Sequence, residues 1–320
     1  MSLFSCNVYK IADNHAEKSM KKAALVRTST LVKGDFIDYW DTNSEKPVLL
    51  LIHGFGATTK YQWFKQVELL SAHYRVIMPN LLHFGKSYSE GRKYAVADQV
   101  EMVHNLMTEL EIDTYIMGGV SYGGLVAAEM AVKYPEGLQK LFLLDAAVKF
   151  LGEDDIDRVK KQFDVPSIEA LFVPKEVEGL KKLMYLATMK KSIMPARWLS
   201  EFHEEMYLKN FEDKRTLIVT LMDSLKEYQS HDYSAIEVPV MLIWGSNDAV
   251  IPADRGEKLK EHIGRNAFYH VIKNGGHMPA LTKTKKFNKI LMSFLTHNNV
   301  SLLSKSEDTE IRDEIELKDE

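Results

Sequence analysis

Short apolar runs alternate with helical stretches along much of this chain. The runs are rich in Val, Leu and Ile, and the first four are "PVLLLIHG" (47–54), "YRVIMPN" (74–80), "TYIMGG" (114–119) and "LQKLFLLDAA" (138–147). Runs of this kind are typical of strands that are buried on both faces of a parallel sheet. Helical stretches at 95–111 and 122–134 separate some of them. The alternation predicts an α/β fold with a mostly parallel, doubly wound sheet.

The alternation stops at about residue 150. From there the chain is helical and mixed, and the strand pattern resumes only with "VPVMLIWG" (238–245) and "FYHVIKNGG" (268–276). One sheet interrupted by a helical insertion explains this order. The predicted domains are therefore a core and an inserted helical cap: 28–149 with 234–300, and 150–233.

The two ends of the chain differ from the core. Within residues 1–27, a helical pattern over 8–26 places small apolar residues on one side, among them Ala16, Met20 and Ala23, and lysines elsewhere. This pattern predicts an N-terminal helix that packs on the body of the protein. Peripheral membrane contact through the same helix is the alternative. The acidic stretch 301–320 has no aromatic residue and is predicted to be a disordered tail.

Composition and charge exclude several classes of function. The formal net charge is −4 and no basic stripe is visible, so a nucleic-acid partner is not expected. Cys6 is the only cysteine, which excludes an intramolecular disulfide. The carboxylates of "GEDDID" (152–157) are explained by a helix start, and we expect neither a metal nor a cofactor. No secretory signal or membrane-spanning run is visible, which favours a cytoplasmic location, with or without membrane association.

The sequence "GVSYGG" stands where a predicted strand passes into a predicted helix. Gly119, Ser121 and Gly123 match the G-x-S-x-G pattern of a nucleophile elbow in the structural context that this motif requires. The glycines allow a sharp turn and a close approach of strand and helix, which exposes the serine hydroxyl. We interpret Ser121 as a nucleophile, although a glycine-rich turn alone could explain the motif.

A serine hydroxyl needs a base, and the base needs an orienting acid. The candidate base is His277 in "NGGHMP", just after the last strand run. The candidate acid is Asp248 in "IWGSNDAVIP", directly after a buried strand, although Asn-Asp is also good turn chemistry. The chain order Ser121, Asp248, His277 is the order expected for three loops at one edge of such a sheet. We therefore predict a catalytic triad.

Acyl transfer also needs N–H donors for the developing oxyanion. The loop "HGFG" (53–56) follows a strand and supplies one of them, which we assign to Phe55. Tyr122, the residue after the nucleophile, supplies the other. His53 is interpreted as a residue that braces its loop. Asp145, at the end of another strand run, is an alternative acid in a rearranged triad.

Five motifs carry a resemblance to a known family: "LLLIHGFGA", "PNLLHFGKSYS", "GVSYGG", "LIWGSNDAVIP" and "VIKNGGH". Over about 35–297 the chain resembles the α/β-hydrolase superfamily, and most of all its monoacylglycerol-lipase-like branch and plant relatives. The resemblance implies an eight-stranded sheet with a helical cap inserted after the sixth strand. It implies the same triad and the same two oxyanion donors. Asn80 departs from the pattern, because many members have Asp at this position.

The expected function is hydrolysis of carboxylic esters with an apolar acyl chain, such as a small-molecule ester or lipid. The apolar cap residues Trp198, Met194 and Phe172 are the candidates for substrate binding, although Met and aromatic residues at helical spacing are more often packing residues. A hydrolase of carbon–carbon bonds in meta-cleavage products is one alternative. It would need a cation for the substrate carboxylate, and Arg197 is the candidate. A ligand receptor without turnover is the other alternative.

Overall fold

The computed structural model describes residues 8–192 and 194–296. Cys6, the predicted tail at 301–320 and residues 297–300 of the predicted core lie outside these ranges.

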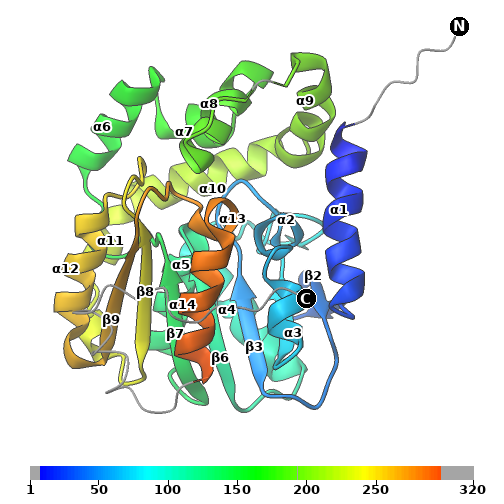
Figure 1. The fold of residues 1–320 in the computed structure, drawn as a ribbon, viewed down its shortest axis with the longest axis vertical. Helices are drawn as coiled ribbons and strands as arrows, with labels where there is room; N and C mark the ends of the chain where they lie inside the picture. Colours follow the sequence, from blue (N-terminus) through cyan, green and yellow to red (C-terminus); the bar gives the residue numbers. More distant parts are fainter. Residues whose placement is uncertain (1–7, 193, 297–320) are drawn as a thin grey trace, which may run out of the picture.

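One twisted sheet forms the centre of the described chain (Figure 1). Its strands follow the spatial order β1-β2-β4-β3-β6-β7-β8-β9, and β3, β4, β6, β7, β8 and β9 are parallel to one another. Their bounds are β1 Val26–Val32, β2 Asp35–Asp41, β3 Val48–Ile52, β4 Arg75–Pro79, β6 Tyr115–Val120, β7 Leu138–Leu144, β8 Val240–Gly245 and β9 Ala267–Ile272. The doubly wound, mostly parallel sheet was predicted from the continuous apolar runs. In β6 and β8 every residue is buried, which explains why these runs do not alternate with polar residues.

The antiparallel end of the sheet differs in detail from the expectation. The strands β1 and β2 form a hairpin around Lys33 and Gly34, both of which have positive φ. A ninth strand, β5 (Tyr88–Ser89), pairs antiparallel with β2, whereas the resemblance implied eight strands. This extra strand has only two residues. If β5 is not counted, the cap follows the sixth strand, as the resemblance implied.

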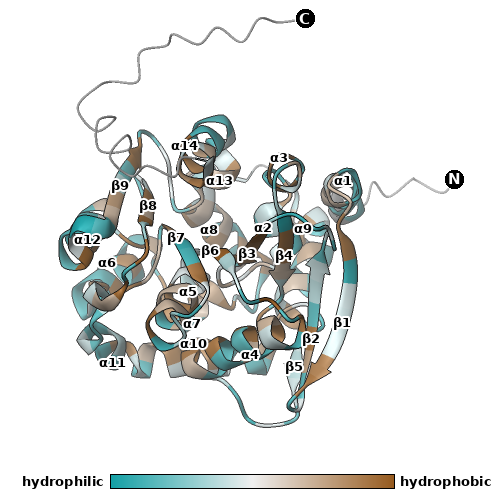
Figure 2. Ribbon diagram, turned by 90° about the horizontal axis from the view of Figure 1, so that it is seen from below, coloured by the Kyte–Doolittle hydropathy of each residue, from teal (hydrophilic) through white to brown (hydrophobic). Residues whose placement is uncertain are grey.

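Helices cover both faces of the sheet, as Figure 2 shows from below. One face carries α1 (Val8–Lys22), α2 (Thr59–Trp63), α3 (Val67–Ser71), α13 (Pro279–Thr282) and α14 (Thr284–Thr296). The other face carries α4 (Val96–Glu109), α5 (Tyr122–Lys133) and α12 (Ala253–Ile263). Each face has its own apolar core, so the central strands are shielded from solvent on both sides, whereas most of the edge strand β1 is exposed.

The segment between β7 and β8 forms a helical layer over one edge of the sheet (Figure 1). It contains α6 (Glu153–Phe163), α7 (Ile168–Phe172), α8 (Val177–Thr188), α9 (Ala196–His203), a π-helix (Glu204–Leu208), α10 (Phe211–Asp223) and α11 (Leu225–Ser230). We call α6 to α10 the cap. It lies over the edge at which the parallel strands end, where the loops with the predicted site residues also lie.

The N-terminal helix α1 ends at Lys22, four residues before the end of the predicted helix. Ala24 adopts positive φ, and Val26 already pairs with β2. Ala16, Met20 and Ala23 are buried against the body, as the first interpretation of this helix predicted. No helix in the described ranges is long and apolar enough to cross a membrane. Membrane contact through α1 stays a prediction.

The departure at Asn80 has a local explanation. The Asn80 amide donates to Asp38 Oδ2 at 2.7 Å and accepts from the Thr59 N–H at 3.0 Å. Asp38 is buried and also binds Arg27 through two contacts of 2.7 Å. An aspartate at position 80 would place two carboxylates in contact, and only one guanidinium would neutralise them. The neutral Asn80 amide can therefore donate to the Asp38 carboxylate without adding a second negative charge.

Candidate active site

Ser121 lies at the sharp junction between β6 and α5. Its backbone has φ 52° and ψ −118°, a strained conformation for a residue that is not glycine. A Cβ on Gly123 would lie 2.2 Å from the carbonyl oxygen of His53, and one on Gly119 would lie 2.2 Å from that of Gly123. The glycines therefore permit the close approach of strand and helix that the motif predicts. This turn holds the serine side chain above the edge of the sheet.

The three residues of the predicted triad are in hydrogen-bond contact. His277 Nε2 lies 3.0 Å from Ser121 Oγ, and His277 Nδ1 lies 2.8 Å from Asp248 Oδ2. All three are largely buried, with exposed fractions of 9% for Ser121, 7% for Asp248 and 4% for His277. The serine and the histidine are 156 positions apart in the chain. The arrangement allows a proton to pass from the hydroxyl to the imidazole.

The loop of the acid and the loop of the base support each other. Asp248 Oδ1 accepts from the N–H groups of Val250 (2.8 Å) and Ile251 (3.1 Å), which fixes the carboxylate. The Asn247 N–H donates to the Gly275 carbonyl at 2.8 Å and joins the two loops. Since Asp248 Oδ2 is directed at Nδ1 of the imidazole, this contact favours the tautomer with the proton on Nδ1, which leaves Nε2 facing Ser121 Oγ as an acceptor.

Asp145, the alternative acid, lies beside Asp248 and not against the histidine. It is fully buried, and its Oδ1 accepts from the Gly245 N–H at 2.8 Å. Burial, and then the neighbouring Asp248 carboxylate, raise the pKa of Asp145 well above its ordinary value. Its other carboxylate oxygen, Oδ2, is buried and has no hydrogen-bond partner among the described residues. Asp145 has no hydrogen bond to His277 within the described ranges, which favours Asp248 as the orienting acid.

Both residues that are predicted to supply oxyanion donors lie next to the serine. Phe55 and Ser121 line the same two pockets, and Tyr122 follows the serine at the first position of α5. Neither the Phe55 N–H nor the Tyr122 N–H has a hydrogen-bond partner within the described part of the chain. Two uncommitted donors beside a predicted nucleophile are the arrangement that would stabilise a tetrahedral oxyanion.

His53 has the bracing contacts that the sequence interpretation assigned to it. Its Nδ1 lies 2.8 Å from the Gly54 carbonyl oxygen, and its Nε2 accepts from the Leu81 N–H at 3.0 Å. Complete burial lowers the pKa of His53 to about 4, so the ring is neutral at pH 7. The ring therefore joins the Phe55 loop to the end of β4, and both of its nitrogens are occupied by backbone contacts.

The cap braces the same loop from the opposite side. The Tyr207 hydroxyl, on the π-helix, donates to the Gly56 carbonyl oxygen at 2.6 Å, and the side chain is buried. Lys214 Nζ donates to the carbonyl oxygens of Met206 (2.8 Å) and Lys209 (2.6 Å), which supports the π-helix, and burial lowers the pKa of Lys214 to about 8. Single π-helical turns often mark functional sites. The sequence analysis missed Tyr207, because no local motif distinguishes it from other cap aromatics.

The cap also contacts the loops of the acid and the base. Arg158 on α6 donates to the carbonyl oxygens of Ala249 (2.8 Å) and Val250 (3.0 Å), next to Asp248. The Met278 N–H, next to His277, donates to the Ala187 carbonyl of α8 at 3.1 Å. The Phe55 loop, the Asp248 loop and the His277 loop are thus all hydrogen-bonded to the cap.

We expect Tyr207→Phe to lower kcat about fivefold to tenfold with little change in KM. The substitution keeps the ring but removes one buried hydrogen bond of about 1 kcal/mol, which loosens the loop that carries the Phe55 N–H. Steady-state kinetics with an activated ester tests this. Tyr185→Phe is the matched control, because Tyr185 lies on the cap helix α8 and lines neither pocket. Equal kcat values for both variants would exclude a role of the Tyr207 hydroxyl in catalysis.

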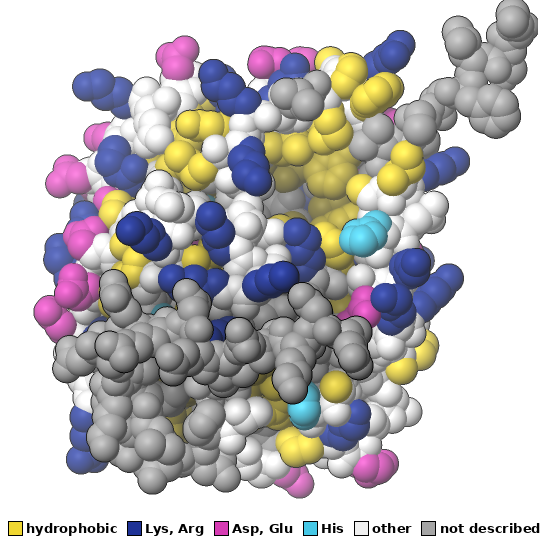
Figure 3. Space-filling model, in the orientation of Figure 1, with side chains coloured by type: hydrophobic (Ala, Val, Ile, Leu, Met, Phe, Trp, Pro, Cys, Tyr) yellow, Lys and Arg dark blue, Asp and Glu magenta, His cyan; other side chains and the backbone are white. Residues whose placement is uncertain are grey.

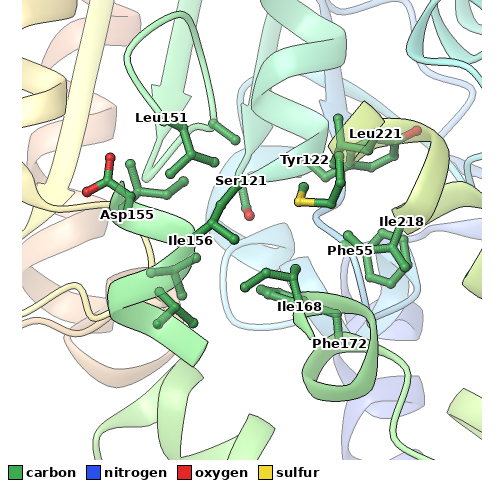
Figure 4. Close-up of a pocket in the computed structure, with 15 residues that line it drawn as sticks. Phe55, Ser121, Tyr122, Leu151, Asp155, Ile156, Ile168, Phe172, Ile218 and Leu221 are labelled. Carbon is green, nitrogen blue, oxygen red and sulfur yellow. The ribbon is translucent and has the colours of Figure 1, made fainter. Parts of the chain in front are cut away.

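Two apolar pockets meet at Ser121. The first, which we call the α6-side pocket, is lined mainly by aliphatic side chains, including Leu151, Ile156, Val159, Ile168, Ile218 and Leu221. Figure 4 shows Ser121 at its centre, with Leu151 and Ile156 to one side and Phe55 and Ile218 to the other. Its one carboxylate, Asp155, is paired with Arg255 through contacts of 3.0 and 3.2 Å.

The second pocket, which we call the α8-side pocket, contains both Ser121 and His277. Its apolar lining includes Leu183, Met184, Leu186, Phe202, Met278 and Leu281. It corresponds to a hollow lined by hydrophobic side chains on the face seen in Figure 3, between α8, α9 and α2. No Lys, Arg, Asp or Glu of the described ranges lines this pocket.

The three candidate substrate-binding residues have different positions. Phe172 lines both pockets. Trp198 and Met194 line neither, and Trp198 is 36% exposed on α9. Arg197, the candidate cation of the alternative reaction, is exposed and stacks on Trp198, with its guanidinium carbon 5.7 Å from the ring centroid. Within the described ranges, no group of three or more Asp, Glu, His or Cys residues is arranged to hold a metal ion.

Comparison with known proteins adds family information to this geometry. A family model described as "alpha/beta hydrolase fold" matches residues 47–284. A 2-hydroxy-6-oxononadienedioate/2-hydroxy-6-oxononatrienedioate hydrolase of Paraburkholderia phymatum is 27% identical over 270 residues, which cover 81% of this chain and 90% of the relative. The monoacylglycerol lipase ABHD6 of Homo sapiens is 25% identical, with 80% and 79% covered.

Solved structures of other proteins have a similar fold. The crystal structure of a bacterial membrane phospholipase A superposes with a TM-score of 0.77 and 24% identity, covering 90% of this chain and 91% of that one. At this identity the likeness shows the fold alone.

Proposed function

Because the chain belongs to the α/β-hydrolase fold family, we propose that it is a serine hydrolase of carboxylic esters with an apolar acyl chain. In this proposal Ser121, His277 and Asp248 are the catalytic triad, and the N–H groups of Phe55 and Tyr122 form the oxyanion hole. The observation that carries it is the meeting of two apolar pockets at a hydrogen-bonded Ser-His-Asp arrangement.

The mechanism follows from the contacts of the three side chains. His277 Nε2 takes the proton of Ser121 Oγ, which attacks the ester carbonyl carbon. The carbonyl oxygen becomes negative and accepts hydrogen bonds from the two N–H groups, each worth about 3 kcal/mol of barrier. Asp248 stabilises the imidazolium. The imidazolium then protonates the leaving alcohol, and water repeats the sequence on the acyl-enzyme.

Only one of the two pockets is lined by the histidine. This difference indicates which pocket holds the alcohol of the ester and which holds the acyl chain. His277 lines the α8-side pocket together with Ser121, but it does not line the α6-side pocket. The leaving alcohol must contact the histidine that protonates it. The alcohol therefore occupies the α8-side pocket, and the acyl chain occupies the aliphatic α6-side pocket.

A carbon–carbon bond hydrolase is the second candidate, since one relative is named for a dienedioate substrate. Such a substrate carries carboxylates, and a buried carboxylate needs a cation. Among the described residues, no Lys or Arg lines either pocket at Ser121. Arg197 is exposed to solvent beside Trp198. These observations favour the ester.

We expect kcat/KM to rise with acyl chain length and then to level off. Each additional methylene buried among the aliphatic side chains contributes about 0.8 kcal/mol, or roughly fourfold, until the α6-side pocket is full. The experiment is a rate series over p-nitrophenyl esters and monoacylglycerols of increasing chain length, with Ser121→Ala as the blank.

A different substrate preference would contradict the ester proposal. Turnover of a dienoate meta-cleavage substrate by the wild-type protein, with no turnover of any ester, would establish the carbon–carbon reaction instead. Arg197→Ala is then the matched variant, because loss of that turnover would identify Arg197 as the residue that binds the substrate carboxylate.

A further inference from the structure

Gln62 is the polar residue of the α8-side pocket that the proposed mechanism does not use. It lies on α2, one residue before the buried Trp63, and only 1% of its surface is exposed. Its side-chain nitrogen Nε2 is buried and has no hydrogen-bond partner within the described part of the chain. A buried amide donor without a partner is costly, and each such group in a native protein needs an explanation.

The other polar side chains in this pocket are committed. The Tyr61 hydroxyl donates to Asp13, the Thr188 hydroxyl donates to the Met184 carbonyl at 2.7 Å, and Tyr207 donates to Gly56. Ser121 and His277 are committed to each other. Outside the reacting groups, Gln62 is therefore the side chain of this lining that can offer a substrate a hydrogen bond.

The chemistry of the pocket restricts what can bind this amide. No charged Lys, Arg, Asp or Glu of the described ranges lines it, so the ligand group is neutral. The lining is otherwise apolar, so the ligand carries few polar atoms. A primary amide has both donors and an acceptor, and a hydroxyl group can satisfy either kind.

We propose that the Gln62 side-chain amide binds a free hydroxyl of the leaving alcohol, so that the preferred substrates are esters of a small polyol such as glycerol. This inference rests on the proposed ester hydrolysis, because the position of His277 is what assigns the α8-side pocket to the leaving group. It makes Gln62 a specificity-determining residue for the alcohol, whereas the α6-side pocket selects the acyl chain.

The test compares two esters of one fatty acid, the 1-monoacylglycerol and the propyl ester, which differ only in the two free hydroxyls. The protein is assayed as wild type and as Gln62→Met, which keeps the length of the side chain and removes the amide. We expect wild type to prefer the glyceryl ester. In the variant, kcat/KM for the glyceryl ester should fall about tenfold, while kcat/KM for the propyl ester stays within twofold.

Gln66→Met is the matched control. Gln66 is also buried near α2, but its Nε2 donates to the Ala280 carbonyl at 2.9 Å and it does not line the pocket. This substitution should change the rates for both esters by the same factor. Labelling of Ser121 by a fluorophosphonate probe shows that each variant retains a folded site.

The outcomes separate this inference from the function on which it rests. An unchanged ratio of glyceryl to propyl ester in Gln62→Met, with both esters cleaved by wild type, overturns the role of Gln62 and leaves ester hydrolysis intact. Absence of Ser121-dependent turnover of either ester overturns both. A rate loss that is equal for the two esters identifies a general structural effect and also overturns the assignment.

Discussion

Ser121→Ala is expected to lower kcat for ester hydrolysis by roughly 10⁶-fold, the scale seen when a triad serine is removed from a serine hydrolase. Alanine has no hydroxyl to attack the carbonyl, so the acyl-enzyme cannot form. The two N–H groups of the oxyanion hole remain, so a small residual rate over water is expected. The measurement is kcat for the best p-nitrophenyl ester in the chain-length series, with product release followed over hours for the variant.

The control for this substitution is Ser200→Ala, an exposed serine on the cap helix α9, which should keep full activity. A fluorophosphonate probe should label wild type and Ser200→Ala, but not Ser121→Ala. If wild type is not labelled, while Ser121→Ala binds a ligand as tightly as wild type does, the protein is a receptor on a hydrolase fold and the proposed function is wrong.

Most of the fold could be predicted from the sequence because its central strands are buried on both faces. A strand of this kind has no polar side and reads as a continuous apolar run, as in β3 and β8. The predicted end of α1 was less accurate. The boundary between α1 and β1 depends on the left-handed turn at Ala24 and on pairing with β2, and neither leaves a clear local pattern.

The predicted triad residues could be brought together in sequence analysis for a geometric reason. Parallel strands end at the same edge of a sheet, so residues directly after β6, β8 and β9 must lie near one another whatever their distance along the chain. Ser121, Asp248 and His277 occupy those three loops. The order of these residues along the chain therefore predicted that their side chains lie close together in the fold.

The cap has no comparable rule that predicts from the sequence which of its side chains reach the site. In a helix, neighbouring residues point about 100° apart, so the choice of one aromatic over the next residue is decided by packing alone. On α9 it is Leu199 that is buried, while the adjacent Trp198 faces outward. Tyr207 and Gln62 were missed for a related reason. Their roles depend on which hydrogen bonds they make or lack in the folded chain.

Asp248→Asn is expected to lower kcat by about 10⁴-fold, because an asparagine can offer its NH₂ group to the histidine and favour the wrong tautomer. His277 Nε2 would then carry a proton and could not accept one from Ser121.

Asp145→Asn should change kcat by less than about threefold. Burial and the Asp248 charge raise the pKa of Asp145 and so favour its neutral form, and asparagine is also neutral and keeps an acceptor for the Gly245 N–H. Steady-state kcat at pH 7 for the two variants decides between the two acids. A loss of about 10³-fold or more in Asp145→Asn, with a mild effect of Asp248→Asn, would establish the rearranged triad instead.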